Sequence, residues 1–381
     1  MKKTLLLLSC AIAYFNSYAQ YQSRQPINFP KVGGYEVLKA DFHTHTIFSD
    51  GQVTPSERIV EAYNEGLDAV AITDHLEIQR NVKDVTTSTN RNRSYELTIP
   101  TAEKLDIISI KGCEITRVVQ PGHSNAIFIK DAEEIFNPTN NENPADAEGY
   151  EEAVRIAKKQ GGFIFYNHPF HQLADDKITM PKEVKNLIET GDIEGIEVIN
   201  GDRFCQEGYD WAMENNLTIV ANSDAHSSMP VCLRQHDITH RAMTLVLAKE
   251  RTPEAILEAL RAHRTIVRWR ETLIGREELV KELVSTCLPM IDYSIDGRNL
   301  TFKVKNISSQ KFRLEPISTD DFFIAHPMVL SENTETIVST NISSTIGDEF
   351  VIRFRVVNAW SDYQKPVIVE YTFRELLKTG F

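Results

Sequence analysis

Short apolar runs alternate with helical patterns from about residue 35 to residue 270, and this alternation constrains the fold more than any other feature of the chain. We expect strands at residues 37–42, 69–72, 107–110, 125–129, 163–166, 196–199, 218–221 and 242–247. Helix start signals lie between several of them, at Thr54-Pro55-Ser56-Glu57, Asn143-Pro144 and Thr252-Pro253. Such alternation predicts an α/β fold with a parallel sheet, either open or closed into a barrel.

Side chains that can bind metals follow these apolar runs at most of the strand ends. The set comprises His43, His45, Asp50, His75, Glu114, His123, His168, Asp224 and His226. In a (β/α) barrel every strand ends at the same face, so these side chains would share one mouth, whereas an open sheet would spread them apart. The sequence therefore favours the barrel.

The types and spacing of these residues indicate a centre for more than one metal ion. His43 and His45 are two residues apart at a strand end, so both imidazoles can reach one ion. Asp224 and His226 repeat this spacing with an oxygen donor. Glu114 follows an apolar strand, where a carboxylate is costly to bury unless it is paired or bound to metal, and its two oxygens can bridge two ions. Mixed imidazole and carboxylate ligands fit two or three divalent ions of zinc, manganese or iron.

The pattern changes beyond about residue 290, where apolar and polar residues alternate with a period of two. Leu300, Phe302 and Val304 show this alternation, as do two segments at residues 350–356 and 367–373. This pattern predicts a small all-β domain, an immunoglobulin-like sandwich, at residues 290–381 after a barrel domain at residues 36–285.

The first residues and the composition limit where the chain acts and what it binds. Residues 1–19 have two lysines, a short apolar stretch and a small-x-small site ending at Ala19, which predicts a cleaved signal peptide and a secreted or periplasmic protein. Lipid attachment at Cys10 is the alternative, and the apolar stretch is too short for a membrane span. The formal net charge of −13 argues against nucleic-acid binding. Four cysteines would remain after cleavage, and their spacing does not identify a pair.

The ordered motifs resemble the PHP family, named for polymerase and histidinol phosphatase, over about residues 36–270. They are His43-Thr44-His45-Thr46, Ser49-Asp50-Gly51, Thr73-Asp74-His75, Gly112-Cys113-Glu114, Gly122-His123, Asn167-His168-Pro169 and Asp224-Ala225-His226. The resemblance implies a distorted seven-stranded (β/α) barrel that usually holds three metals. It assigns His43, His45, Glu114 and Asp224 to one ion, Glu114, His123 and His168 to a second, and Asp50, His75 and His226 to a third.

A metal centre of this kind predicts hydrolysis of a phosphate ester, with a hydroxide that bridges two ions as the nucleophile and no covalent intermediate. Glu114 would bridge the ions, and His75, His226 or Asp74 would assist the leaving group. Arg117 and Arg203 are the candidates for binding the phosphate of a small phosphorylated substrate. Two alternatives remain open: a metal-dependent hydrolase of a non-phosphate bond, such as an amide, and a non-catalytic binding protein.

Overall fold

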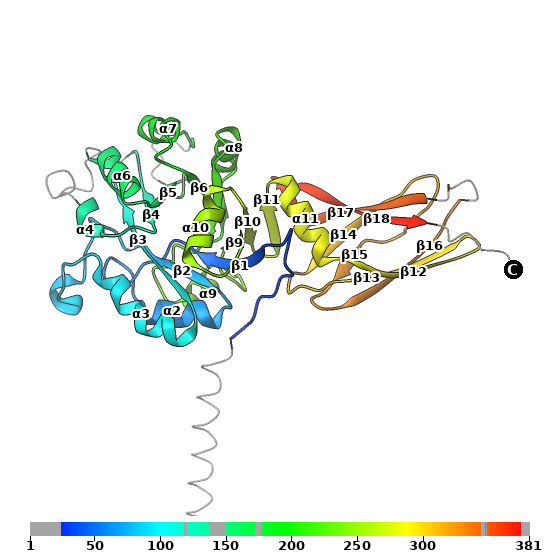
Figure 1. Cartoon of the computed structure of the whole chain (residues 1–381), viewed down its shortest axis with the longest axis horizontal. Helices are drawn as coiled ribbons and strands as arrows, with labels where there is room; N and C mark the ends of the chain where they lie inside the picture. Colours follow the sequence, from blue (N-terminus) through cyan, green and yellow to red (C-terminus); the bar gives the residue numbers. More distant parts are fainter. Residues whose placement is uncertain are drawn as a thin grey trace, which may run out of the picture.

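The computed structural model describes residues 24–117, 120–136, 149–171, 177–343, 347 and 349–374. The predicted signal peptide, Cys10 and the predicted helix start at Asn143-Pro144 lie outside these residues. The described chain forms two lobes side by side, one of strands surrounded by helices and one built mainly of long strands (Figure 1). Within the described residues, no helix is long and apolar enough to cross a membrane.

The first lobe contains all eight strands that the sequence predicts, together with three short ones. Its strands are β1 (Glu36–Asp41), β2 (Ala69–Ile72), β3 (Ile108–Ile115), β4 (Ser124–Ile127), β5 (Phe163–Tyr166), β6 (Gly195–Asn200), β7 (Arg203–Phe204), β8 (Thr218–Asn222), β9 (Met243–Ala248), β10 (Thr265–Trp269) and β11 (Thr272–Gly275). Its helices are α2 (Pro55–Asn64), the π-helical turn η1 (Val82–Thr86), α3 (Arg93–Leu105), α4 (Ala132–Ile135), α6 (Tyr150–Lys159), α7 (Lys182–Glu189), α8 (Gln206–Glu214), α9 (Met229–Gln235) and α10 (Pro253–Arg261).

Local sequence signals account for the helix starts. Thr54 caps α2 in a reciprocal capping box with Glu57, and Pro55 occupies the first turn of the helix. Thr252 caps α10 in the same position before Pro253. Gly66 follows α2 with a φ of +77°, the left-handed conformation that ends many helices.

The sheet of the first lobe is mixed, which corrects the expectation of a parallel sheet. The pairs β1–β2, β2–β3, β5–β6 and β6–β8 are parallel. In contrast, β4 runs antiparallel to both of its neighbours, and β9 runs antiparallel to β1. The described residues of the connection from β3 to β4, 116–117 and 120–123, carry no helix, and the chain turns back beside β3 instead of crossing over to a parallel position.

Side chains also join β8 to β9 and to the end of β1, which are not its neighbours in the sheet. Ala221 N in β8 donates a hydrogen bond to Thr244 Oγ1 in β9 (2.9 Å), and Phe42 N, just after β1, donates to Asn222 Oδ1 (2.8 Å). Buried apolar side chains from β1, β2, β5, β8 and β9 form one cluster inside the lobe, which includes Phe42, Phe163 and Phe165. The strands therefore curve toward each other, and their closure into a seven-stranded barrel stays a prediction.

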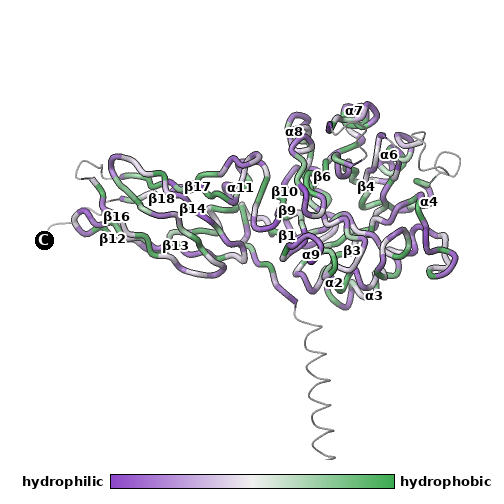
Figure 2. Tube along the Cα trace, turned by 180° about the vertical axis from the view of Figure 1, so that it is seen from behind, coloured by the Kyte–Doolittle hydropathy of each residue, from purple (hydrophilic) through white to green (hydrophobic). Residues whose placement is uncertain are grey.

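The second lobe consists of two facing layers of strands, with helix α11 (Glu277–Cys287) at its junction with the first lobe. One layer has β12 (Met290–Asp296), β13 (Asn299–Lys305) and β16 (Glu335–Asn341), and the other has β14 (Phe312–Ile317), β15 (Met328–Leu330), β17 (Glu349–Asp362) and β18 (Lys365–Arg374). Apolar and polar residues alternate along these strands, as Figure 2 shows by colour. The inward side chains meet between the layers, where Phe302 of β13 contacts Phe354 and Phe373 of the other layer. The predicted all-β segment is present, and its immunoglobulin-like topology stays a prediction.

One sheet continues through both lobes, a feature that the sequence patterns do not show. Strand β11 of the first lobe pairs in parallel with β17 of the second, with Leu273 opposite Ala359 and Ile274 opposite Trp360. Helix α11 packs its buried face, including Leu283, in the same hydrophobic cluster as residues of β17 and β18. The lobes are therefore joined by backbone hydrogen bonds and a shared core rather than by a linker alone.

Candidate metal centre

The nine predicted ligands gather at one end of the strands in the first lobe. His43 and His45 follow β1, and the backbone of Thr44 between them pairs with that of Ala225, between Asp224 and His226. His75 follows β2, and its backbone pairs with that of Glu114 near the end of β3. The antiparallel course of β4 brings His123, which precedes that strand, to the same end of the sheet. Strand direction thus explains how a residue at the start of a strand joins residues at the ends of others.

Four overlapping groups of these side chains are compact enough to hold a metal ion, with ligand atoms within 4.8 Å of one another. The groups are His45, Asp50, His75 and His226; His43, His45 and Asp224; His43, Glu114 and His168; and His75, Glu114 and His123. All nine predicted residues belong to at least one group. The grouping differs from the predicted partition because His43, His45 and His75 each belong to two groups.

Glu114 lies at the centre of the cluster and is fully buried. Its Oε1 lies 2.9 Å from His123 Nδ1 and 3.5 Å from His168 Nε2, and its Oε2 lies 2.8 Å from His75 Nδ1 and 3.3 Å from His45 Nε2. The two oxygens therefore face different histidines, as a carboxylate that bridges two ions would require.

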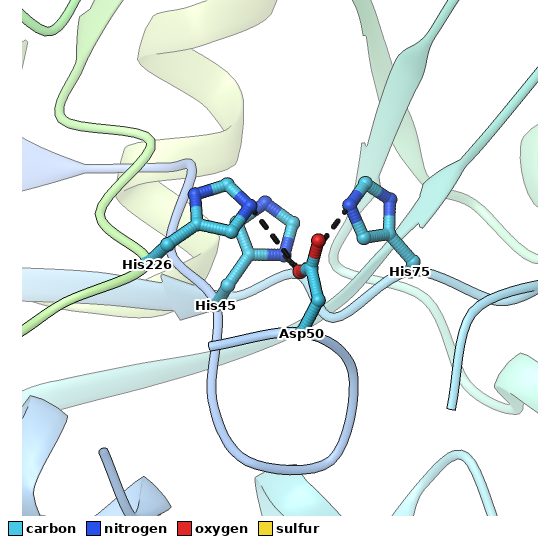
Figure 3. Close-up of side chains that lie close together, drawn as sticks. All are labelled: His45, Asp50, His75 and His226. Atoms are coloured by element: carbon cyan, nitrogen blue, oxygen red, sulfur yellow. Dashed lines mark ion pairs between the residues drawn. The ribbon is translucent and has the colours of Figure 1, made fainter. Parts of the chain in front are cut away.

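The group around Asp50 lies at the rim of the cluster (Figure 3). The Asp50 carboxylate points between the rings of His226 and His75, with Oδ1 3.2 Å and 3.5 Å from their Nε2 atoms. His45 lies behind the His226 ring, with a centroid separation of 4.2 Å. His226 is 38% exposed, more than any other of the nine side chains, so this group borders the solvent.

Three carboxylate oxygens in the cluster fit the presence of cations. Asp50 Oδ1, Glu114 Oε2 and Asp224 Oδ1 are buried, and within the described residues none of them accepts a hydrogen bond. A buried carboxylate oxygen that accepts no hydrogen bond destabilises the folded state by about 1–3 kcal/mol or more, unless a positive charge compensates it. These oxygens and the facing imidazoles match the donor set of divalent transition metals.

The electrostatics of the cluster lead to the same conclusion. Although burial favours the neutral ring of His226, the adjacent carboxylates of Asp50 and Asp224 raise its pKa to about 9. Burial likewise opposes charge on His43, yet Asp224, Glu197 and Glu114 raise its pKa well above the usual value. Burial and the neighbouring charges of His226 and His75 lower the pKa of His45 to about 4. The carboxylates thus attract positive charge into the centre, a role that divalent cations can fill.

A ring of buried polar residues that the sequence reasoning did not select orients the ligands. Glu197, in the middle of β6, accepts hydrogen bonds from His43 Nδ1 (2.9 Å), His168 N (2.9 Å), Asn200 Nδ2 (3.0 Å) and Asn222 Nδ2 (2.8 Å). Its bond to Nδ1 leaves His43 Nε2 facing Glu114 and Asp224. A signal was present, since a glutamate inside the apolar run 196–199 needs several partners to be buried.

Two of the ligands have strained backbones. His168 has a φ of 27° and Asp224 a φ of 49°, conformations that cost about 1–3 kcal/mol in residues other than glycine. The bond from His168 N to Glu197 and the bond from Asp224 N to His43 O (2.9 Å) hold these conformations. Strain of this kind is concentrated at functional sites.

Asp74 contacts a loop rather than the ligand cluster. Its Oδ1 accepts hydrogen bonds from Thr46 N (2.7 Å) and Ser49 Oγ (2.6 Å), and its Oδ2 accepts one from Thr46 Oγ1 (2.8 Å). These bonds fix the turn that carries Asp50. The geometry therefore favours a positioning role for Asp74 over the proton transfer predicted from the sequence.

The two predicted phosphate-binding arginines do not lie together. Arg117 is completely buried, and its guanidinium donates to Glu77 Oε1 (2.6 Å). Arg203 is exposed in β7 and stacks over Phe170, 4.1 Å from the ring centroid. The burial of Arg117 argues against direct substrate contact, whereas Arg203 stays accessible beside the mouth.

A cavity of about 200 Å³ adjoins the cluster. Asp224 and His226 line it from the metal side, and Met229, Cys232 and His236 line it from α9 and the residue that follows. This cavity therefore provides space for a substrate group beside the candidate metal ligands.

Comparison with known proteins places the chain in a family. Residues 41–225 match the model of the PHP domain. The structure resembles the crystal structure of a two-domain protein from Bacteroides vulgatus that contains a predicted PHP-like metal-dependent phosphoesterase, with a TM-score of 0.82 and 35% sequence identity. That match covers 92% of this chain and 99% of the other. The chain therefore belongs to the PHP family, and the resemblance predicted from the motifs is confirmed.

Other similarities are partial. An uncharacterised protein from Methanocaldococcus jannaschii is 36% identical over 86 residues, which span 21% of this chain and only 35% of that protein. Histidinol phosphate phosphatase from Lactococcus lactis, solved with zinc, L-histidinol and phosphate, has a TM-score of 0.31 and 15% identity, covering 54% of this chain and 95% of that one. A similarity this low carries no conclusion about function.

Proposed function

We propose that the protein is a metal-dependent phosphoesterase that hydrolyses phosphate mono- or diesters of a small molecule. One observation carries this proposal: nine ligand side chains converge in overlapping groups around Glu114, with three buried carboxylate oxygens that lack hydrogen-bond donors. The relative from Bacteroides vulgatus, similar along its whole length, supports the same class of activity.

The residues take distinct roles in this proposal. When bound, two or three divalent ions of zinc, manganese or iron would activate water for attack on phosphorus and neutralise charge on the phosphoryl oxygens. Glu114, His43, His45 and Asp224 hold the inner positions, with His123 and His168 on the other side of Glu114. Asp50, His75 and His226, the group at the rim of the cluster, assist phosphate binding and departure of the leaving group. Asp74 acts through the turn that carries Asp50.

The proposal also covers the domain architecture and the location of the protein. We infer a distorted seven-stranded barrel followed by an immunoglobulin-like sandwich, with domain limits near residues 285 and 290. The N-terminal sequence supports cleavage near Ala19 and a secreted or periplasmic protein.

The test is a metal count joined to a panel of substrates. Purified mature chain should contain at least two divalent ions and should hydrolyse an aryl phosphate monoester or diester. Full metal loading without turnover of either ester would overturn the proposal and favour hydrolysis of another bond, such as an amide. The double variant His43→Ala/His45→Ala should lose both metal and activity, and an active, fully loaded variant would refute the ligand assignment.

A further inference from the structure

A wide groove of about 680 Å³ lies at the junction of the two lobes, outside the metal cluster. Residues of the first lobe line most of it, among them Asp202, Phe204, Gln206, Glu207 and Trp269. The second lobe contributes Tyr363, from the turn between β17 and β18. The lining of the groove therefore combines residues of both lobes.

Aromatic rings form one wall of this groove. Phe204 stacks on Tyr363 with a centroid distance of 5.5 Å and an interplanar angle of 9°, and on Trp269 at 6.2 Å and 27°. Trp269 Nε1 donates a hydrogen bond to the carbonyl of Asp202 (3.0 Å), and Trp360 contacts Tyr363 edge-on. Tyr363 is nevertheless 47% exposed. A fixed, partly exposed wall of aromatic faces carries negative charge density that attracts polarised C–H groups.

The rim of the groove is rich in hydrogen-bond acceptors. Gln206 Nε2 donates to Asp210 Oδ1 (2.7 Å) and Asp362 Oδ1 (3.2 Å), which fixes the orientation of the amide. Gln206 Oε1 is then buried and accepts no hydrogen bond from any described residue. With the carboxylates of Asp202 and Glu207, it forms a set of acceptors that suits a ligand with several donors. Arg203 also lines the groove, so the charged residues of the lining, two carboxylates and one guanidinium, leave a net negative charge that disfavours an anionic group.

The groove is connected to the metal cluster through the turn between β6 and β7. Asn200, at the end of β6, pairs with Arg203 in the groove wall, and its Nδ2 donates to Asp224 Oδ2 (3.0 Å). Asp202 Oδ2 lies 3.3 Å from Nδ1 of His236, which lines the cavity beside Asp224 and His226. The cavity next to the metals and the groove thus share this turn as a common border.

We infer that the groove binds a neutral sugar ring of the substrate, so that the substrate class is a phosphorylated saccharide of more than one ring. A sugar ring offers C–H groups to the aromatic wall and several hydroxyl donors to the acceptors at the rim, whereas the edge of a nucleobase has few donors. The phosphoester would then occupy the metal centre while the next ring lies in the groove. The inference rests on the proposed phosphoesterase function and gives the second lobe a part in substrate selection.

A binding experiment tests the groove independently of catalysis. The metal-loaded full chain is titrated with maltose, cellobiose and N,N′-diacetylchitobiose, and with adenosine as the nucleobase probe, while tryptophan fluorescence is recorded. We expect a saturable change with at least one disaccharide, and about two- to tenfold weaker binding by Tyr363→Ala, the loss expected for one aromatic contact. The control is Phe323→Ala, since Phe323 is 70% exposed in the loop between β14 and β15 and lies outside the groove; its binding should equal that of the wild type.

Two results of this titration would overturn the inference: no saturable change with any of the three disaccharides, or equal affinity of the wild type and Tyr363→Ala. Binding of adenosine in place of the disaccharides would assign the groove to nucleosides instead. Unchanged thermal melting of Tyr363→Ala would show that the variant is folded.

A kinetic comparison tests the connection with the metal centre. The kcat/KM for maltose 1-phosphate should exceed that for glucose 1-phosphate by about two- to tenfold, and Tyr363→Ala should bring the ratio close to one. An unchanged ratio would refute the shared substrate. If no phosphate ester is hydrolysed, aryl phosphates included, the proposed function fails, while the disaccharide titration still decides whether the groove binds a sugar.

Discussion

Replacement of Glu197 by glutamine would show how strongly the ligands depend on the residue behind them. The carboxylate is fully buried, and each oxygen accepts two hydrogen bonds: Oε1 from His43 and Asn222, and Oε2 from His168 and Asn200. Glutamine keeps the shape but offers one oxygen and one NH₂ group. Whichever way the amide is oriented, its NH₂ group faces two hydrogen-bond donors, either those of His43 and Asn222 or those of His168 and Asn200.

The size of the effect follows from these contacts. Breaking a buried, charge-assisted set of hydrogen bonds costs about 3–5 kcal/mol of folding stability. Loss of a residue that orients metal ligands lowers metal affinity by about 10- to 100-fold. His43 would lose the acceptor that fixes its ring, and His168 the bond that holds its strained backbone, so the inner metal positions should weaken most.

Metal affinity is measured by competition with a fluorescent chelator, and stability by thermal unfolding with and without metal. Glu197→Gln should need more metal for activity yet recover most of it at saturating concentrations, which a merely unstable variant would not do. Glu194→Gln is the matched control, because Glu194 pairs with Lys158 and Arg261 at the surface, just before the same strand. Wild-type metal affinity in Glu197→Gln would refute the role of Glu197.

Three further predictions concern the centre and its surroundings. Metal binding should release protons at neutral pH and weaken as the pH falls, because the pKa of His226 is raised to about 9 and the ion requires the neutral ring. Calorimetry in two buffers with different ionisation enthalpies measures the release of protons, and the absence of this release would contradict the prediction. Gly51→Ala should destabilise the chain by about 1–3 kcal/mol and weaken the outer metal position, since a Cβ would lie 2.7 Å from the carbonyl carbon of His45; an unchanged melting temperature and metal count would disprove this. Arg117→Met should lower stability by about 3–5 kcal/mol, because it leaves the buried carboxylate of Glu77 without its guanidinium and with only the hydrogen bond from Thr116 N; a stable variant with a raised KM would restore the substrate role of Arg117.

The strands and the candidate ligands could be predicted because their signals are local. A carboxylate or imidazole directly after an apolar run indicates a strand end, and His43-x-His45 needs only the two-residue repeat of a strand to place both rings together. Strand ends on one face then bring distant motifs such as Glu114 and Asp224 to one place. Each of these steps depends on residues within a few positions of each other.

Other features depend on contacts that no local pattern describes. The antiparallel direction of β4 is determined by the short connection that follows β3, and it alone explains how His123 reaches Glu114. The burial of Arg117 depends on Glu77, which lies in another loop. The position of Arg117, three residues after Glu114, predicts a place at the mouth of the barrel, but this spacing does not indicate the pairing with Glu77.

The shared sheet has a consequence for how the protein is made. The edge of β11 receives its partner only when β17 has been synthesised, long after the residues of the first lobe. Until then the first lobe keeps an open strand edge, which other chains can pair with. A chain truncated before β17 would contain every metal ligand and would still expose that edge. The second lobe therefore covers the strand edge of the first. Its removal should cause aggregation before any loss of the metal sites.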